Sequence, residues 1–361
     1  MWAAGRRPRH CKCRLDGENR AVLWRRLQGG RARWLLRVAV SIGIVTYILV
    51  DVDTEDLVRT LASVRPVPLA GALALYLAGQ VLSAYKWSLL GRSVGYVRPV
   101  GEYTRFYFIG MFFNLFGPST IGGDVVRALY LAEGHRPGIA INSVVFDRVS
   151  GLVLLMALGA AALIAFPQYG LPWPLTASLV AGGLVLVLGW WMCPRLVRLL
   201  PAGNRFRRQV ETELGPFWRD RVLLVRVAVA SLAFHLTQVG VQYILARAAG
   251  VALPFSYCSV YHPVISLMTA LPLSVAGLGV REGGYLYFLT RIDVDDSIAV
   301  TLGLLWFALT VVAGLVGGAL FVASGAALPR VHPQPAASAD VIADPRRSLG
   351  SGRTASMPPG E

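Results

Sequence analysis

Charged residues are scarce in this chain. Lys, Arg, Asp and Glu make up 15% of its 361 residues, and 55% of the residues are hydrophobic, whereas soluble domains are typically about a quarter charged. The composition therefore argues against an ordinary soluble protein. Long uncharged runs, each near or beyond the ~18–20 residues that cross a bilayer as a helix, indicate a polytopic membrane protein. These runs are 66–85, 149–166, 175–193, 227–246 and 297–329.

Cysteine and lysine are also rare. The four cysteines are too few and too scattered for a disulfide framework. Cys11 and Cys13 lie beside His10, but no second Cys/His pair is in range, so we expect no metal site. Lys12 and Lys86 are the only lysines, and neither closes a glycine-rich phosphate loop. We therefore expect no ATP binding of the usual kind and no cofactor.

Acidic residues are outnumbered, with 20 Asp and Glu against 35 Lys and Arg. The basic residues cluster, with eleven in 1–37, six in 86–136, eight in 195–226 and four from 330 onward. Because cytoplasmic loops carry the excess of positive charge, these segments are predicted to face the cytoplasm. The prediction is a multi-pass protein of the cell membrane with both termini cytoplasmic. The poorly basic loops 51–66, 167–174 and 250–256 are then outside.

The two ends of the chain differ from its middle. Residues 1–33 form an arginine-rich segment, predicted to lie on anionic lipid at the cytoplasmic surface rather than on nucleic acid. No small-residue cleavage site follows the first apolar run, 34–50, so this run is predicted to stay as an anchor. Residues 326–361 are rich in Pro, Ala, Ser and Arg and are predicted to be a disordered cytoplasmic tail.

Two further apolar stretches, 106–123 and 256–280, do not fit as full crossings. If both crossed, the basic segment 195–226 would lie outside, against the charge rule. They are better interpreted as re-entrant hairpins, whose helix breaks survive where protein or a wet cavity covers the backbone. The predicted fold class is an all-α, polytopic helical integral membrane protein of about six full spans plus two re-entrant hairpins. The helix breakers are Gly110, Gly117, Pro118, Gly122 and Gly123 in the first stretch and Pro263, Pro272, Gly277 and Gly279 in the second.

The segments repeat in order. The transmembrane domain, 34–325, divides into halves 34–166 and 174–325 with one plan: span, span, hairpin, span. Three crossings per half invert the second half relative to the first. Paired Gly/Pro-interrupted segments in inverted halves indicate the central site of a transporter. In the first hairpin Pro118, Thr120, Gly123, Val126 and Arg127 match Pro272, Ser274, Gly277, Val280 and Arg281 of the second at identical spacing.

Each hairpin is predicted to expose backbone N–H groups where a helix restarts, with an arginine about one turn later. This is an anion-binding arrangement. The alternative is that Arg127 and Arg281 extend to lipid headgroups while the glycines permit close packing. No catalytic residue is predicted. The predicted substrate-binding residues are Pro118, Gly122, Gly123, Asp124, Arg127, Arg148, Pro272, Ser274, Gly277, Gly279, Arg281 and Glu282.

Other polar residues lie inside predicted spans. Asp147 and Arg148 begin the fourth apolar segment, where ionisable residues indicate function by default; the alternative is a helix-end pair at the interface. His235, Gln238 and Gln242 form one polar stripe, and Gln80 with Ser83 forms a shorter one. These stripes either join helices by hydrogen bonds or line a cavity, with His235 as a proton carrier.

Three stretches carry a resemblance to a known family. Tyr85, Lys86 and Trp87 end the second span; Gly110 to Arg127 is followed by Asp147 and Arg148; and Pro272 to Glu282 forms the third. Together they resemble the transmembrane, flippase-like domain of lysylphosphatidylglycerol synthases over roughly residues 34–325. In bifunctional members, that domain moves an aminoacylated phospholipid across the bilayer and a separate soluble domain makes it. After Pro329 only a short tail follows, so the chain resembles a stand-alone member.

The resemblance implies a non-enzymatic flippase-like transporter. We expect it to move a lipid or polyprenyl-lipid with an anionic headgroup between its repeats, alongside a partner enzyme that makes the lipid. One alternative is a glycosyltransferase that uses a polyprenyl-phosphate donor, with Asp51 and Asp53 or the cluster of Asp293, Asp295 and Asp296 as metal-binding acids outside. Another is a regulatory membrane subunit that transports nothing.

Overall fold

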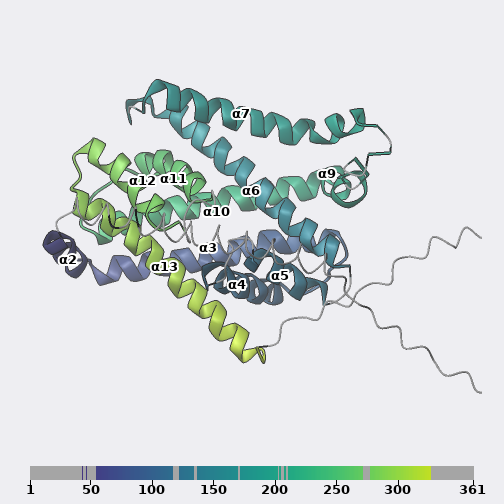
Figure 1. Cartoon of the computed structure of the whole chain (residues 1–361), viewed down its shortest axis with the longest axis horizontal. Coiled ribbons are helices and arrows are strands. Elements are labelled where there is room, and N and C mark those ends of the chain that lie inside the picture. The colour runs from purple at the N-terminus through teal and green to yellow at the C-terminus, as the bar shows by residue number, and fades with distance from the viewer. Residues whose placement is uncertain are drawn as a thin grey trace, which may run out of the picture.

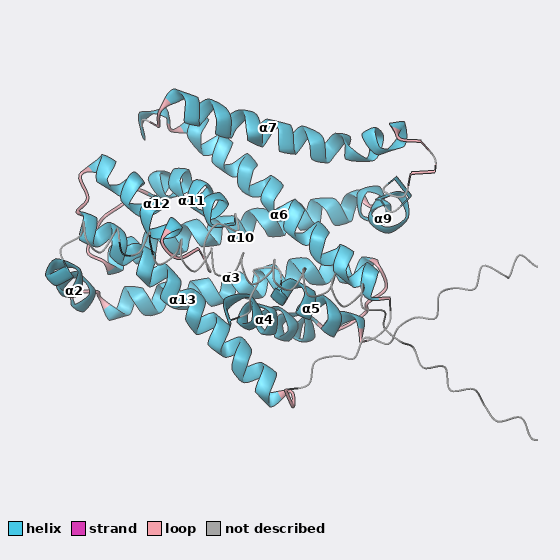
Figure 2. Cartoon of the chain, viewed as in Figure 1, coloured by secondary structure: helices cyan, strands magenta, loops and turns pink. Residues whose placement is uncertain are grey.

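The computed structural model describes residues 54–116, 122–133, 136–169, 171–201, 203–204, 207–208, 210–270 and 277–326, together with Gly43 and Thr46. Within these ranges the chain is helical and contains no strand (Figure 2). The first apolar run lies almost entirely outside the described residues. So do both terminal segments, Asp51 and Asp53, and the predicted site residues Pro118, Pro272 and Ser274.

Five helices are long and apolar enough to cross a membrane. With 24 to 29 residues each and a rise of 1.5 Å per residue, they exceed the roughly 30 Å of the hydrocarbon core. The prediction of an all-α polytopic membrane fold is therefore confirmed. The five helices are α3 (Pro66–Ser93), α6 (Pro137–Ala165), α7 (Trp173–Leu196), α10 (Arg221–Ala248) and α13 (Asp296–Ala323), shown in Figure 1.

Shorter helices connect and complete the long ones. The hairpin pairs are α4 (Val100–Phe116) with α5 (Gly122–Ala132) and α11 (Phe255–Ala270) with α12 (Val280–Leu289). The connecting turns are α2 (Thr54–Ala62), η1 (Pro167–Tyr169), η2 (Val197–Leu199), η3 (Val210–Leu214), α9 (Gly215–Arg219) and η4 (Thr290–Ile292).

The first hairpin begins and ends at the same face of the molecule. Arg98, before α4, pairs with Glu133, after α5, at 2.6 Å. The hydrogen bond with Glu133 raises the pKa of Arg98. Tyr96 donates to the carbonyl of Arg136, just before α6, at 2.9 Å. Because these three connections meet, α4 and α5 enter and leave without crossing. We call this end the basic face, since Arg195 and Arg219 also lie there, at the end of α7 and beside the start of α10.

The second hairpin enters from the opposite face. The hydroxyls of Tyr169, in η1, and Ser256, at the start of α11, lie 2.5 Å apart. Tyr257 donates to the carbonyl of Phe288 near the end of α12. The start of α11 and the end of α12 therefore share one face with the connection between α6 and α7. The described helices thus form two hairpins that enter from opposite sides.

Each hairpin packs against the last long helix of the other half. Helix α4 lies on α13, and α11 lies on α6. Glycines permit both contacts: a Cβ at Gly317 would stand closer than 3.0 Å to the carbonyl of Phe108, and one at Gly159 would stand 2.9 Å from Pro263. Helices α3 and α10 pack together between these pairs. The two halves therefore share one interior.

Two helices continue well past the apolar runs that indicated them. Helix α3 extends to Ser93 although its uncharged run ends at Tyr85, and α6 begins at Pro137 although its run begins at Val149. An uncharged run ends at the first charged residue, but a helix can continue past a charged residue that pairs with an opposite charge inside the protein. Lys86 and Asp147 are such residues.

Candidate functional site

Five ionisable side chains gather where α3, α5 and α6 meet. We call them the charged cluster: Lys86 from α3, Asp124 and Arg127 from α5, and Asp147 and Arg148 from α6. Asp124, Arg127 and Arg148 belong to the predicted substrate-binding set. Lys86 does not.

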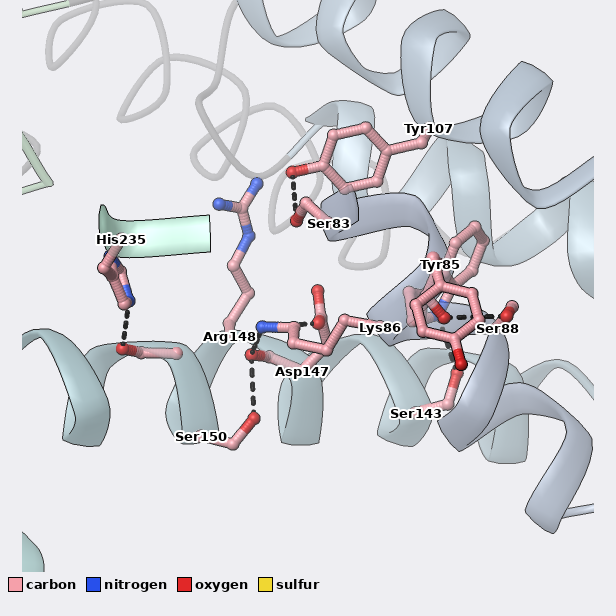
Figure 3. A network of polar contacts seen from close by, with 12 residues as sticks. Ser83, Tyr85, Lys86, Ser88, Tyr107, Ser143, Asp147, Arg148, Ser150 and His235 are labelled. Atoms are coloured by element: carbon pink, nitrogen blue, oxygen red, sulfur yellow. Dashed lines mark hydrogen bonds and ion pairs between the residues drawn. The ribbon is translucent and has the colours of Figure 1, made fainter. Parts of the chain in front are cut away.

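Lys86 and Asp147 form the innermost ion pair of the charged cluster. The Lys86 ammonium lies 2.8 Å from the Asp147 carboxylate, and both side chains are at most 5% exposed. Lys86 also donates to the backbone carbonyl of Asp147 at 3.0 Å. Figure 3 shows Lys86 extending from α3 toward Asp147 on α6. Because the pair is buried, each charge depends on the other to offset its loss of water.

Arg127 bridges the two aspartates. Its Nε donates to Asp124 and its Nη2 to Asp147, both at 3.1 Å. The guanidinium also lies 4.8 Å from the ring of Trp87 and 4.9 Å from the ring of Tyr107, close enough for cation–π attraction. The residue is 2% exposed. This geometry argues against extension to the headgroups and places Arg127 inside the protein; a direct role in binding substrate stays a prediction.

Arg148 is the exposed member of the charged cluster. It donates from Nε and Nη2 to both oxygens of Asp124, at 3.0 and 2.8 Å, yet 54% of its side chain is accessible. It does not pair with its neighbour Asp147, because adjacent residues point in different directions on a helix. Figure 3 shows Arg148 projecting from α6 away from Ser150.

The charged cluster carries an excess of positive charge. Three cations, Lys86, Arg127 and Arg148, face two carboxylates, Asp124 and Asp147. Asp147 is shared by Lys86 and Arg127, and Asp124 by Arg127 and Arg148. The net charge is therefore about +1 by ordinary ionisation, and its accessible part is the Arg148 guanidinium.

The helix starts behind both hairpin tips are partly capped by the chain itself. The N–H of Gly123 donates to the side chain of Asn114 at 2.9 Å, and the N–H of Gly279 donates to the carboxylate of Glu282 at 2.6 Å. Gly277 and Gly279 have φ of +77° and +82°, which glycine adopts without strain. An anion at either tip would therefore compete with a side chain for these N–H groups. Their predicted role in substrate binding is not tested by this geometry.

Arg281 lies in the first turn of α12, in the position that corresponds to Arg127. It is 7% exposed, and its guanidinium lies 6.0 Å from the ring of Phe307. A Cβ at Gly277 would stand 3.2 Å from its Nη2, so the backbone turn packs directly on this arginine. Both of these arginines are therefore buried, and of the two only Arg127 belongs to the charged cluster.

The polar stripe of α10 makes contacts between helices. The Nε2 of His235 donates to the carbonyl of Gly151 on α6 at 2.9 Å. Tyr285 of α12 donates to Gln242 at 2.5 Å, and Gln238 packs on Gly79 of α3. All three stripe residues are at most 7% exposed. These contacts favour the interpretation that the stripe joins helices; lining of a cavity stays a prediction, as it does for the buried Gln80 of α3.

Sequence reasoning assigned no site role to Lys86, Trp87 or Tyr107. The signal for Lys86 was present, because it is one of two lysines and lies about two turns before the end of a spanning helix. The apolar run stops at this lysine, so hydropathy marks it as the end of a span. The aromatic residues carried no signal of their own, since aromatic residues are common in membrane helices.

Comparison with known proteins agrees with this architecture. Residues 34–318 match the family described as the lysylphosphatidylglycerol synthase TM region. The match extends from the first apolar run into α13 and so includes both hairpins and the whole charged cluster. No curated protein matches the chain. A match over this much of the sequence shows that the chain belongs to the lysylphosphatidylglycerol synthase transmembrane family.

Proposed function

We propose that this membrane protein moves an anionic lipid, or polyprenyl-lipid, across the bilayer and receives its headgroup at the charged cluster. The observation that carries the proposal is the net positive charge of the cluster, held between helices just behind the tip of a re-entrant hairpin. Charge at membrane depth is costly, and ionisable residues kept there typically mark a substrate or ion pathway. Family membership supports a lipid-related function.

Arg148 is the proposed contact for the headgroup. Its bonds to Asp124 use Nε and Nη2, which leaves Nη1 for a phosphate oxygen. The remaining members of the cluster hold this side chain in place: Arg127 orients Asp124, and Lys86 with Asp147 fixes α6 against α3. A planar guanidinium held by a carboxylate is pre-oriented for phosphate.

The proposal also includes an orientation. The basic face is cytoplasmic by the positive-inside rule, so the first hairpin and the charged cluster open toward the cytoplasmic leaflet. Both termini then face the cytoplasm of a cell-membrane protein. A partner enzyme that makes the lipid would deliver it to this side.

The test is lipid movement in vesicles that contain only the purified chain. NBD-labelled phosphatidylglycerol is the probe, and dithionite reports the leaflet of the label. Arg148→Gln should slow movement roughly tenfold to a hundredfold, the cost of a lost charge-assisted contact. Arg105→Gln removes an exposed arginine from α4 near the same face and should retain the wild-type rate.

Two outcomes would count against the proposal. Equal rates in Arg148→Gln and the wild type would remove the headgroup role from the charged cluster. No movement of phosphatidylglycerol or of other anionic lipids by the wild type would favour a regulatory subunit that transports nothing.

A further inference from the structure

A cleft at the basic face is lined by none of the residues of the charged cluster. It has a volume of about 820 Å³ and lies between the end of α7 and the start of α10. Trp190 and Trp191 form one wall. The last turn of α7, η2, the end of α9 and the start of α10 each contribute an arginine to its mouth. These are Arg195, Arg198, Arg219 and Arg221.

An apolar groove adjoins the cleft. This groove, of about 510 Å³, runs between α6, α7 and α10 and is lined by side chains such as Val153, Ala157 and Leu188. Trp190, Trp191, Leu224 and Val225 line both spaces. The two spaces therefore adjoin, with arginines around the cleft and apolar side chains along the groove.

Among the described residues, the arginines at the mouth outnumber the carboxylates beside it, so the mouth carries an excess of positive charge. Glu211 also lines it, but its carboxylate accepts from Arg207 at 3.0 Å. The nearby Asp220 accepts from the N–H of Leu223 at 2.9 Å and caps α10. The guanidinium of Arg195 lies 4.5 Å from the ring of Trp191, facing the cleft wall. In the part of the chain that the structure describes, none of the four mouth arginines forms an ion pair.

We propose that this site binds one anionic phospholipid, with its phosphate among the mouth arginines and an acyl chain in the groove between α7 and α10. A phospholipid matches both parts, because it joins a negative phosphate to a long hydrocarbon chain. Tryptophans beside arginines at the end of spanning helices are typical of the headgroup level of a bilayer. The proposal does not depend on transport through the charged cluster.

A second copy of the chain fits the site less well. Helix α7 is apolar on every side and packs on α6, with Gly183 its one buried residue, so something apolar must cover its other faces. A symmetric dimer through this surface would bring the same patch of each copy together. The arginines of both mouths would then meet, and like charges repel. A lipid covers the apolar face and neutralises the arginines.

The first test concerns the headgroup. The purified full chain in detergent is titrated with phosphatidylglycerol and followed by native mass spectrometry. Arg195→Gln/Arg219→Gln should weaken the apparent affinity of the tightest bound lipid about tenfold. Arg105→Gln/Arg136→Gln removes the same charge from exposed positions near the same face and should bind as the wild type does. Arg148→Gln should also retain this lipid, which separates the site from the charged cluster.

The second test concerns the acyl chain. Ala157→Trp fills the groove and leaves the arginines intact, so it should also weaken binding about tenfold. Leu236→Trp adds the same ring at an exposed position of α10 and should leave binding unchanged. Unchanged affinity in the arginine pair overturns the proposal. Weaker lipid binding in Arg195→Gln/Arg219→Gln together with unchanged binding in Ala157→Trp also overturns it, because the arginines would then only attract lipid to the surface. Dissociation of a dimer in either variant, with lipid affinity unchanged, would assign the site to a second copy.

Discussion

Asp147 is the side chain on which most of the charged cluster depends. It receives both Lys86, at 2.8 Å, and Arg127, at 3.1 Å. Removing one partner of a buried ion pair leaves an uncompensated charge, and this costs more than the pair itself contributes. Loss of Asp147 would leave Lys86 buried without a carboxylate partner and Arg127 with Asp124 alone, whereas loss of Lys86 would leave Asp147 paired with Arg127. The two partners of this ion pair are therefore not equivalent.

We expect Asp147→Asn to lower the free energy of unfolding by about 3–5 kcal/mol. Lys86→Met, which fits an unbranched apolar chain into the same space, should cost less, about 1–2 kcal/mol. The measurement is unfolding by SDS titration in mixed micelles, with Arg105→Gln as the surface control. If Lys86→Met lowered the free energy of unfolding as much as Asp147→Asn or more, Lys86 and Arg127 would not share the charge of Asp147 as the distances indicate.

A substitution at Arg127 would alter stability as well as transport. If this arginine only bound the headgroup, replacing it would impair transport and leave the fold intact. In the structure it bridges Asp124 and Asp147 and lies against Trp87 and Tyr107, a geometry that the single ammonium of lysine cannot reproduce. Arg148, more than half exposed, is therefore the better position at which to separate binding from stability.

The first hairpin depends on close approach of α4 to α5. A Cβ at Gly123 would stand closer than 3.0 Å to the backbone carbonyl of Gly110 and to the side chain of Asn114, whereas one at Gly122 would meet nothing within 4 Å. A backbone atom cannot move aside as a flexible side chain can. The two adjacent glycines of this helix start therefore have different roles, which the sequence alone does not distinguish.

We expect Gly123→Ala to separate α4 from α5 and to lower the free energy of unfolding by about 2–3 kcal/mol, the usual cost of overpacking. Gly122→Ala should be within about 1 kcal/mol of the wild type and can be stabilising, because alanine favours helix over glycine. SDS-titration unfolding of the two variants, compared side by side, tests this. Equal effects would mean that the hairpin is not packed as tightly as the structure shows.

At the scale of the whole molecule, the arrangement depends on packing between halves. Each hairpin lies on the last long helix of the other half, through Gly317 and Phe108 on one side and Gly159 and Pro263 on the other. Each hairpin is thus held in place by a long helix from the other half. A substitution in one half is therefore expected to change the packing of the hairpin in the other half.

The orientation of the whole molecule is open to a direct test. In a variant with the four native cysteines replaced by serine, Asp53→Cys should react with a membrane-impermeant maleimide in intact cells. Arg208→Cys, exposed at the basic face, should react only after the membrane is opened. The opposite pattern would reverse the orientation and place the charged cluster on the outer side.

The sequence by itself determined the helical membrane class, the long helices and the positions of the two hairpins. These follow from hydropathy, from Gly and Pro breaks and from the distribution of Arg, all of which are local along the chain. Only the tertiary structure decided how the charges pair. Lys86 and Asp147 are 61 residues apart, and Arg148 and Asp124 are 24 apart. Such pairs form because helices from different parts of the chain bring buried charges together, and in a low-dielectric interior each charge is stable only beside its partner.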